Sequence, residues 1–163
     1  MIRAEMVQAR DVSLDYDREL PDGLGLWSEV SHLERQYPGF RSWYFGKVVP
    51  GIITGHRCVL TRRHAGRLVG LAIAKRGEEN KLCTLWVDPR LRGLGIANGL
   101  ADEVFDWMGS HHPLFTVPEE HLCNFSGLLN RWAFVQTQII SSYYRPGKQE
   151  FVFNGTLEPH WSS

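Results

Sequence analysis

The chain has 163 residues, 43% of them hydrophobic and 22% charged, which is the composition of an ordinary globular protein. Its 18 basic and 18 acidic residues give a formal net charge of zero, which argues against a general polyanion-binding protein and leaves no strong nucleic-acid signal. No apolar run reaches the roughly 20 residues of a membrane span, and residues 1–10 carry charges where a signal peptide would be apolar. We therefore expect a cytoplasmic protein without membrane contact, folded as a single domain over residues 1–163.

Periodicity in the first third of the chain predicts a short strand followed by two helices. The strand covers residues 2–9. Apolar residues then recur every three or four positions between residues 24 and 37, which is the spacing of a helix, and Pro38-Gly39 ends it. A second helix is expected over residues 40–49, with Pro50-Gly51 stopping it.

The rest of the chain predicts an alternation of strands and helices. Apolar runs and short Gly-containing turns predict a three-stranded antiparallel meander, with strands at residues 57–61, 67–75 and 81–87. A helix, a strand, a second helix and a hairpin of two strands follow, at residues 96–108, 114–117, 126–132, 135–144 and 150–154. Gly109 is expected to cap the first of these helices. This order is that of an α/β fold with a mixed sheet.

A Gly-rich loop joins the third strand of the meander to the next helix, within residues 87–100. Small residues at positions 93, 95 and 97 allow a ligand to approach the backbone closely. Backbone N–H groups at a helix start have no intrahelical partner and favour an anion. Arg92 adds a positive charge beside them, and the side chain of Asn98 is a possible donor. These features predict a site for a pyrophosphate group.

Other interpretations of this loop fit less well. A P-loop requires Gly-Lys followed by Ser or Thr, and this chain has Gly95-Ile96-Ala97 instead. A dinucleotide fold requires the spacing G-x-G-x-x-G in a repeated βαβ array, whereas the glycines here lie at 93, 95 and 99 and follow a meander. A turn that only caps a structural helix is the remaining alternative.

The loop resembles the acetyl-CoA motif of the GNAT acetyltransferases, which is Arg/Gln-x-x-Gly-x-Gly/Ala. The matching residues are 92–97, and the Val-x-Pro that typically precedes the motif is present as Val87-Asp88-Pro89. The resemblance implies a mixed, mostly antiparallel sheet that is splayed into a V and flanked by helices, with acetyl-CoA as the acetyl donor. It implies that the cofactor contacts Leu85, Trp86, Val87, Arg92, Gly93, Leu94, Gly95, Ile96, Ala97, Asn98 and His121.

The sequence departs from the family pattern where the proton chemistry is usually found. An Asn that many members carry after the second splayed strand is replaced here by His121. The Tyr that these members place on the following helix, where it protonates the leaving thiolate, corresponds to Leu128 or Leu129. The resemblance therefore implies acetyl-CoA binding, but it does not identify a general acid.

Two residues are candidates for the missing proton chemistry. Glu120 is expected near the mouth of the V as a base or as a group that positions water, although an acid that stabilises a helix start is an alternative. Tyr143 and Tyr144 end a predicted strand, so only one of them faces inward, and Tyr144 is the candidate acid. His121 contacts the cofactor, holds a water or lies on the surface.

Aromatic residues of the two N-terminal helices form the candidate acceptor pocket, with a purely structural role as the alternative; they are Trp27, Trp43, Tyr44 and Phe45. Cys58, Cys83 and Cys123 contain no C-x-x-C pair, and no carboxylate–histidine spacing suggests a metal, so we expect none.

The predicted function is direct transfer of an acetyl group to an amine of a small molecule, protein or peptide. One alternative is a non-catalytic acetyl-CoA-binding regulatory protein, and another is a toxin that acetylates aminoacyl-tRNA. A homodimer is left open by the sequence.

Overall fold

The computed structural model describes residues 23–158, so the strand expected at residues 2–9 lies outside the described residues. Six strands form one sheet in the order β1-β2-β3-β4-β6-β5. Their bounds are β1 Arg57–His64, β2 Arg67–Lys75, β3 Lys81–Val87, β4 Leu114–Pro118, β5 Gln136–Ser141 and β6 Gln149–Phe153. Every neighbouring pair is antiparallel except β3 and β4. The sheet is therefore mixed and mostly antiparallel, as the sequence predicts.

The N-terminal helical region differs from the prediction at Pro50. Helix α1 (Gly23–Val30) leads into a 3₁₀ turn, and α2 (Phe40–Trp43) leads through a π-helical turn into α3 (Val49–Ile53). Pro50 was expected to stop the second helix, but the helix continues to Ile53. The reason is the wide turn, in which the N–H of Val49 donates to the carbonyl of Tyr44 five residues back. Pro50 then lies in the first turn of α3, where no backbone donor is needed.

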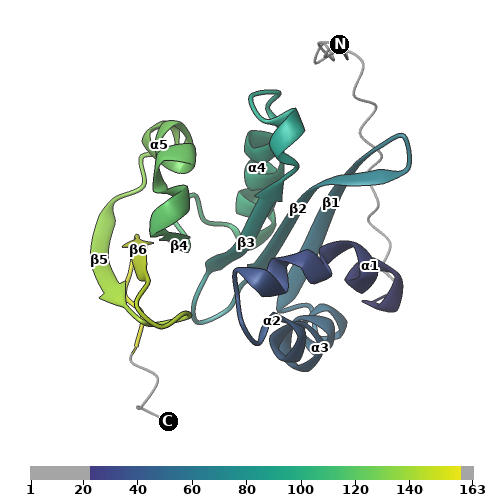
Figure 1. The fold of residues 1–163 in the computed structure, drawn as a ribbon, viewed down its shortest axis with the longest axis horizontal. Coiled ribbons are helices and arrows are strands. Elements are labelled where there is room, and N and C mark those ends of the chain that lie inside the picture. Colours follow the sequence, from purple (N-terminus) through teal and green to yellow (C-terminus); the bar gives the residue numbers. More distant parts are fainter. Residues whose placement is uncertain (1–22, 159–163) are drawn as a thin grey trace.

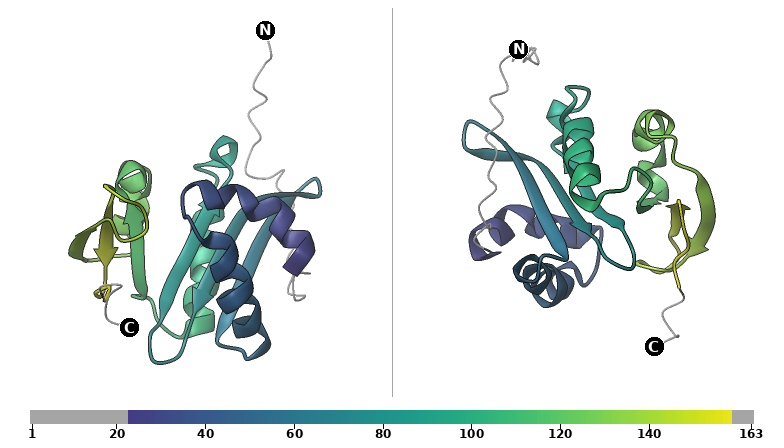
Figure 2. Two further views of the ribbon diagram at one scale, coloured as in Figure 1. Left: turned by 60° about the horizontal axis from the view of Figure 1, so that its bottom comes forward. Right: turned by 180° about the vertical axis from the view of Figure 1, so that it is seen from behind.

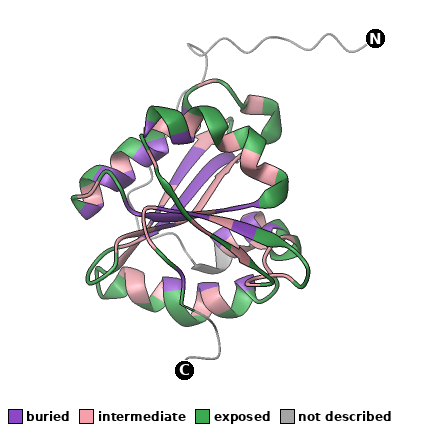
Figure 3. Cartoon of the chain, turned by 90° about the vertical axis from the view of Figure 1, so that its left-hand side faces the viewer, coloured by how far each residue is buried: buried purple, intermediate pink, exposed green. Residues whose placement is uncertain are grey.

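Two layers of helices enclose the sheet. Helices α1–α3 cover one face of β1–β3, and α4 (Ile96–Met108) covers the other, as Figure 2 shows. Helix α5 (Leu122–Arg131) begins four residues before its predicted start and packs on β4 and β6, on the same side as α4. Figure 3 shows that the buried residues lie on the strands and on the inner sides of these helices. None of the helices within residues 23–158 has both the length and the apolarity to cross a bilayer.

Strands β3 and β4 separate soon after they meet. They pair only through Lys81 with Leu114 and Leu82 with Phe115. The next residue of β3, Cys83, is skipped in the register with β2 and forms a β-bulge, which increases the local twist of a strand. Beyond this bulge the two strands diverge, and they leave the open V seen between β3 and β4 in Figure 1.

Helix α4 is fixed on the sheet by close contact and by a buried ion pair. The side chain of Arg62 on β1 is 4% exposed and lies 2.6 Å from the carboxylate of Glu103 on α4. Gly70 on β2 lies directly under the helix, because a Cβ at this position would lie 2.7 Å from Cγ2 of Ile96. These contacts hold α4 against β1 and β2.

Gly70→Ala is predicted to destabilise the protein by about 1–3 kcal/mol, because the added methyl overpacks the contact with Ile96. Gly99→Ala is the matched control, since Gly99 lies inside α4 with no atom within 4 Å of the added Cβ. It is expected to stabilise the protein by about 0.5–1 kcal/mol through helix propensity. Thermal unfolding of both variants measures the difference. Equal unfolding temperatures would show that α4 is not held by this contact.

Candidate active site

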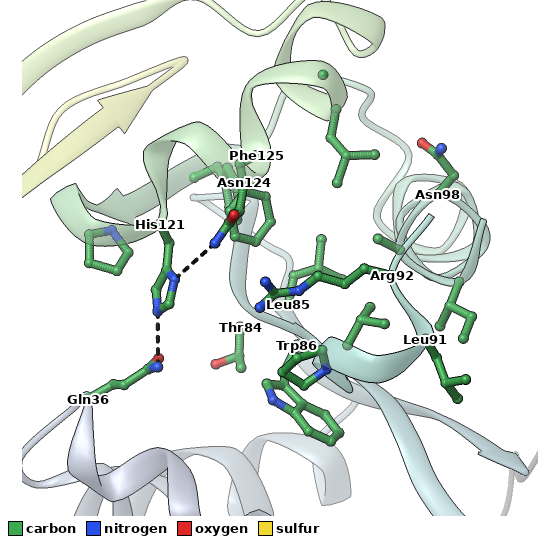
Figure 4. A pocket seen from close by; sticks show the side chains of 18 of the residues that line it. Gln36, Thr84, Leu85, Trp86, Leu91, Arg92, Asn98, His121, Asn124 and Phe125 are labelled. Carbon is green, nitrogen blue, oxygen red and sulfur yellow. Dashed lines mark hydrogen bonds between the residues drawn. The ribbon is translucent and has the colours of Figure 1, made fainter. Parts of the chain in front are cut away.

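A cavity of 720 Å³ occupies the space between the diverging strands. Its walls come from β3, β4, the loop before α4, the first turn of α4, and α5, and Figure 4 shows their side chains around one space. Ten of the eleven predicted cofactor-binding residues line it: Leu85, Trp86, Val87, Arg92, Gly93, Gly95, Ile96, Ala97, Asn98 and His121. Leu94 is not among the lining residues.

The start of α4 has the properties of an anion site. Gly93 and Gly95 have φ values of +81° and +83°, a backbone conformation that side chains other than glycine rarely adopt. A Cβ at either position would meet no protein atom within 4 Å, so the space in front of the loop is open to a ligand. The first turn of α4 contains no acidic residue. Arg92 reaches into the cavity beside it (Figure 4), so the residues present fit a pyrophosphate group.

The loop holds this shape through a buried carboxylate. The side chain of Asp88 is 7% exposed and accepts hydrogen bonds from the backbone N–H of Arg90 at 3.0 Å and from the Arg90 guanidinium at 2.7 Å. Arg67 on β2 donates to the same carboxylate at 3.0 Å. Because these bonds are made within the protein, the anion site is preorganised before a ligand binds.

Asn98 and His121 make contacts that the sequence does not show. The side-chain oxygen of Asn98 accepts a hydrogen bond from Nε1 of Trp132 at 3.2 Å, which joins α4 to the end of α5. His121 lies 3.0 Å from the amide of Gln36 and 3.5 Å from that of Asn124 (Figure 4). His121 therefore connects the second arm of the V to the N-terminal helical region across the cavity.

The structure also places the two leucines that correspond to the family's tyrosine. Leu128 lines the cavity, whereas Leu129 is buried in the core between α5 and the sheet. The cavity-facing position on α5 is thus occupied by an apolar side chain that has no proton to donate.

A second cavity of 230 Å³ lies on the side of the N-terminal helices. Tyr37, Cys83, Thr84 and Thr116 line both cavities and form the wall between them. Of the aromatic residues predicted for the acceptor pocket, Trp43 lines this second cavity, while Trp27, Tyr44 and Phe45 pack with one another in the core under α1–α3.

Glu120, predicted as a base, lines neither cavity. Its carboxylate forms an ion pair of 2.5 Å with Arg145. Partial burial raises the pKa of Glu120, but hydrogen bonds from its own backbone and from Arg145 outweigh this effect and lower the pKa below the ordinary value. A carboxylate held in this way is a weak proton acceptor near neutral pH.

Tyr144, predicted as an acid, lines the second cavity only. Its hydroxyl accepts a hydrogen bond from Nζ of Lys81 at 3.3 Å. The strand expected to run to residue 144 ends at Ser141, because Ser142 has φ +57° and turns the chain out of the sheet. Tyr144 therefore lies in the turn between β5 and β6.

Glu150 is a functional candidate that sequence reasoning missed. It lies on β6, is 1% exposed, and neither of its carboxylate oxygens accepts a hydrogen bond from any residue in the described range. Burial raises its pKa from 4.5 to about 7, although the charge of Arg145 acts in the opposite direction. Glu150 lines neither cavity, but it pairs with Pro118 across the ladder, so its side chain faces the same side of the sheet as the cavity-lining Pro118. The signal in the sequence was a carboxylate at the start of a strand that is otherwise apolar from Phe151 to Phe153.

Tyr37 and Cys83 in the shared wall both remain protonated at neutral pH. Burial raises the pKa of Tyr37 far above its ordinary value, and the negative charge of Glu150 adds to the shift. Burial also raises the pKa of Cys83, which keeps its thiol from acting as a nucleophile. Among residues 23–158, no group of three or more His, Cys, Asp or Glu side chains could hold a metal ion.

Glu150 makes the stability of the protein depend on pH. In the window from about pH 4.5 to about pH 7, the folded protein holds a proton on Glu150 that the unfolded chain releases. The free energy of unfolding therefore falls as the pH rises through this window, by about 3 kcal/mol in total, and stays low above it. Glu150→Gln is predicted to lose this dependence and to gain stability relative to the native protein above pH 7.

Chemical unfolding at pH 5 and pH 8 measures the effect, with Glu119→Gln as a control whose carboxylate is more than one third exposed. A Glu150→Gln variant that keeps the native slope between these two pH values would show that Glu150 is ionised throughout.

Comparisons with known proteins agree on one family. The model of the acetyltransferase (GNAT) family matches residues 19–122. Arabidopsis thaliana Naa50, solved with the bisubstrate analogue CoA-Ac-MVNAL, has a TM-score of 0.62 at 16% identity over 90% of this chain and all of that chain. A GNAT acetyltransferase from Bacillus cereus has a TM-score of 0.60 at 15% identity, over 86% and 94% of the two chains.

An aminoglycoside 6′-N-acetyltransferase complexed with coenzyme A has a TM-score of 0.58 at 15% identity, over 90% of this chain and 98% of that chain. At these identities the solved structures show the fold alone, and no curated protein matches the sequence. The family model covers more than half of the chain, and the splayed sheet with its anion site agrees with it. The chain belongs to the GNAT family of acetyltransferases.

Proposed function

We propose that the protein transfers the acetyl group of acetyl-CoA directly to an amine, with the donor in the larger cavity and the amine in the second. The observation that carries this proposal is the wall of four residues that the two cavities share. Molecules bound on the two sides of this wall come together at Tyr37, Cys83, Thr84 and Thr116. Neighbours solved with coenzyme A and with a peptide-like bisubstrate analogue support an amine as the acceptor class.

The chain supplies two binding elements for the donor. The N–H groups of the first turn of α4, with Arg92, are placed to hold the pyrophosphate. The edge of β3 at Leu85–Val87, which has no ladder partner on β4, is available to pair with the pantetheine amides. The bound donor supplies an activated thioester.

Proton transfer is assigned to Glu150 and Tyr37. The amine nitrogen must be neutral to attack the thioester carbon, and the sulfur takes up a proton as the C–N bond forms and the C–S bond breaks. Glu150 lines neither cavity, so with a pKa of about 7 it accepts the proton of the ammonium through an intervening water. Tyr37 stays protonated and lies in the shared wall, so its hydroxyl donates a hydrogen bond to the leaving sulfur, which takes up the proton that the attacking nitrogen loses. Tyr37 is preferred over Tyr144 because it lines both cavities, and Glu150 is preferred over Glu120 because its pKa is raised toward neutrality rather than lowered.

A direct transfer suits these residues better than an acyl-enzyme route. Cys83 is the cysteine in the shared wall, and burial keeps its thiol protonated. We further propose that the chain acts as one domain in the cytoplasm.

Binding of acetyl-CoA is tested with Gly95→Glu, which places a carboxylate where the pyrophosphate is expected. At a ligand concentration of about 100 times Kd, acetyl-CoA is predicted to stabilise the native protein by about 2.7 kcal/mol, and this stabilisation should be lost in the variant. Gly109→Glu is the matched control, because Gly109 has a similar φ of +70° at the opposite end of α4 and an equally open Cβ position. Thermal shift assays report both. An unchanged shift in Gly95→Glu would place the pyrophosphate elsewhere.

Catalysis is tested by the release of free CoA from acetyl-CoA across a panel of amines. For the best substrate, kcat/KM is predicted to rise with pH and to level off above about pH 7, because Glu150 must be ionised. Glu150→Gln should lower kcat/KM by about 10²-fold and remove this inflection, while Glu119→Gln should keep it.

Two other results would contradict the proposal. Acetyl-CoA binding without CoA release on any amine would indicate a regulatory protein, the alternative that Leu128 favours. Activity on aminoacyl-tRNA alone, with salt-sensitive tRNA binding, would indicate a toxin.

A further inference from the structure

The second cavity contains a row of positive charges. Arg57, Lys75 and Lys81 lie on three adjacent strands, and the ladder pairs Arg57 with Lys75 and Lys75 with Lys81. Residues that are directly paired in a sheet point to the same face, so the three side chains stand next to one another. All three line the second cavity.

Such a row is unfavourable for folding by itself. Like charges placed directly opposite each other destabilise a sheet, and here one carboxylate accompanies three cations in the cavity lining. That carboxylate, Glu79, lies 3.2 Å from Nζ of Lys75 and compensates that residue. The cavity lining therefore keeps an excess of positive charge, although the more distant charges of Glu79 and Glu150 also act on Lys81.

Neutral groups hold the other two cations, Arg57 and Lys81, in place. The Arg57 guanidinium lies over the Trp43 ring at 5.6 Å and donates to Sγ of Cys83 at 3.5 Å. Lys81 donates to the hydroxyl of Tyr144. Within residues 23–158, no carboxylate lies within 4.0 Å of either cation. Burial by itself lowers the pKa of Lys81. The neighbouring groups, led by Tyr144, together outweigh burial, so the pKa lies above its ordinary value and the ammonium stays charged.

We infer that the acceptor is a small amine that also carries a carboxylate, and that this carboxylate binds between Arg57 and Lys81. The inference rests on the proposed function and specifies its substrate class. The guanidinium and the ammonium supply several hydrogen-bond donors for an anion in a partly desolvated cavity, where a charge-assisted bond is strong. A volume of 230 Å³ is small for a ligand site and suits a molecule about as large as an amino acid.

The same charges assist the reaction. An acceptor enters the cavity with its anionic group toward the cations, which leaves its amine free to reach the shared wall at Thr84 and Thr116. Positive charges near an ammonium lower its pKa, because they disfavour the protonated form. The row therefore increases the fraction of neutral amine that can attack.

The test compares amines that differ only in the anionic group. With saturating acetyl-CoA, kcat/KM is measured for a set of amino acids, for their carboxamides, and for aminoalkyl phosphonates of the same length. The free carboxylates are expected to react at least about 10-fold faster than the carboxamides, which corresponds to one charge-assisted interaction. Carboxamides that react as well as the carboxylates would overturn the inference, and a preference for phosphonates would reassign the site to phosphate esters.

Variants of the row identify the residues involved. Arg57→Gln and Lys81→Gln are each expected to raise KM for the carboxylates by about 10-fold and to change the carboxamide rates by less than about 2-fold. Lys47→Gln, at an exposed position on the helical side, is the control. All three variants should keep the thermal shift with acetyl-CoA, because the donor binds in the other cavity. Equal losses on both substrate classes would contradict the assignment.

A second measurement separates this inference from the proposed function. Binding of N-acetyl amino acids to the CoA-loaded protein is followed by calorimetry, without any turnover. Binding that is lost in the Arg57 and Lys81 variants supports the anion site even if no amine is acetylated. Absence of binding to the native protein overturns the site even if another amine is acetylated.

Discussion

The separation of β3 from β4 is the constraint on which the rest of the structure depends. The two strands share two residue pairs before the bulge at Cys83 turns β3 away. Beyond this point their facing edges carry backbone groups without a ladder partner, and a buried group left unsatisfied costs about 1–3 kcal/mol. The fold tolerates this arrangement because the gap is open to water and to a ligand. The arms are held in position from both sides, by the Trp132–Asn98 bond on one side and the His121–Gln36 contact on the other.

The charges around the V are divided between its two sides. Arg92 and the start of α4 face the larger cavity, whereas Arg57 and Lys81 face the smaller one. This division allows two anionic molecules to bind at once, one on each side of the shared wall. The groups that meet at the wall are uncharged or weakly acidic, and a nucleophilic amine and a thioester can approach each other there without a competing ion pair.

Several of these features lower the stability of the folded chain. Glu150 is buried without a hydrogen-bond donor from the described residues, and three cations stand in a row across β1–β3. In natural proteins such exceptions to the usual rules are concentrated at functional sites, and the surrounding core compensates for them. The compensating core here is the layer between the sheet and α4, where Leu100 and Val104 are fully buried.

The sequence by itself determined the elements whose signals are local. Strands β2 and β3 and helix α4 have the predicted bounds, because the apolar runs and the helical periodicity end at glycine-containing turns such as the one at Gly109. The open glycine loop before α4 was predictable for the same reason, since a loop and the helix that follows it are contiguous in the chain. The continuation of the second helix through Pro50 was not predictable, because it depends on a π-helical turn formed before it.

Only the tertiary structure decided the environment of each titratable group. Glu150 and Tyr37 are 113 positions apart in the chain, and the charge of Glu150 raises the pKa of Tyr37 because the fold brings the two side chains near each other. The row of Arg57, Lys75 and Lys81 depends on strand register, which no single segment specifies. A pKa and a substrate charge preference both depend on which groups are buried together. That is a property of the folded chain, because burial and register are long-range, whereas periodicity is local.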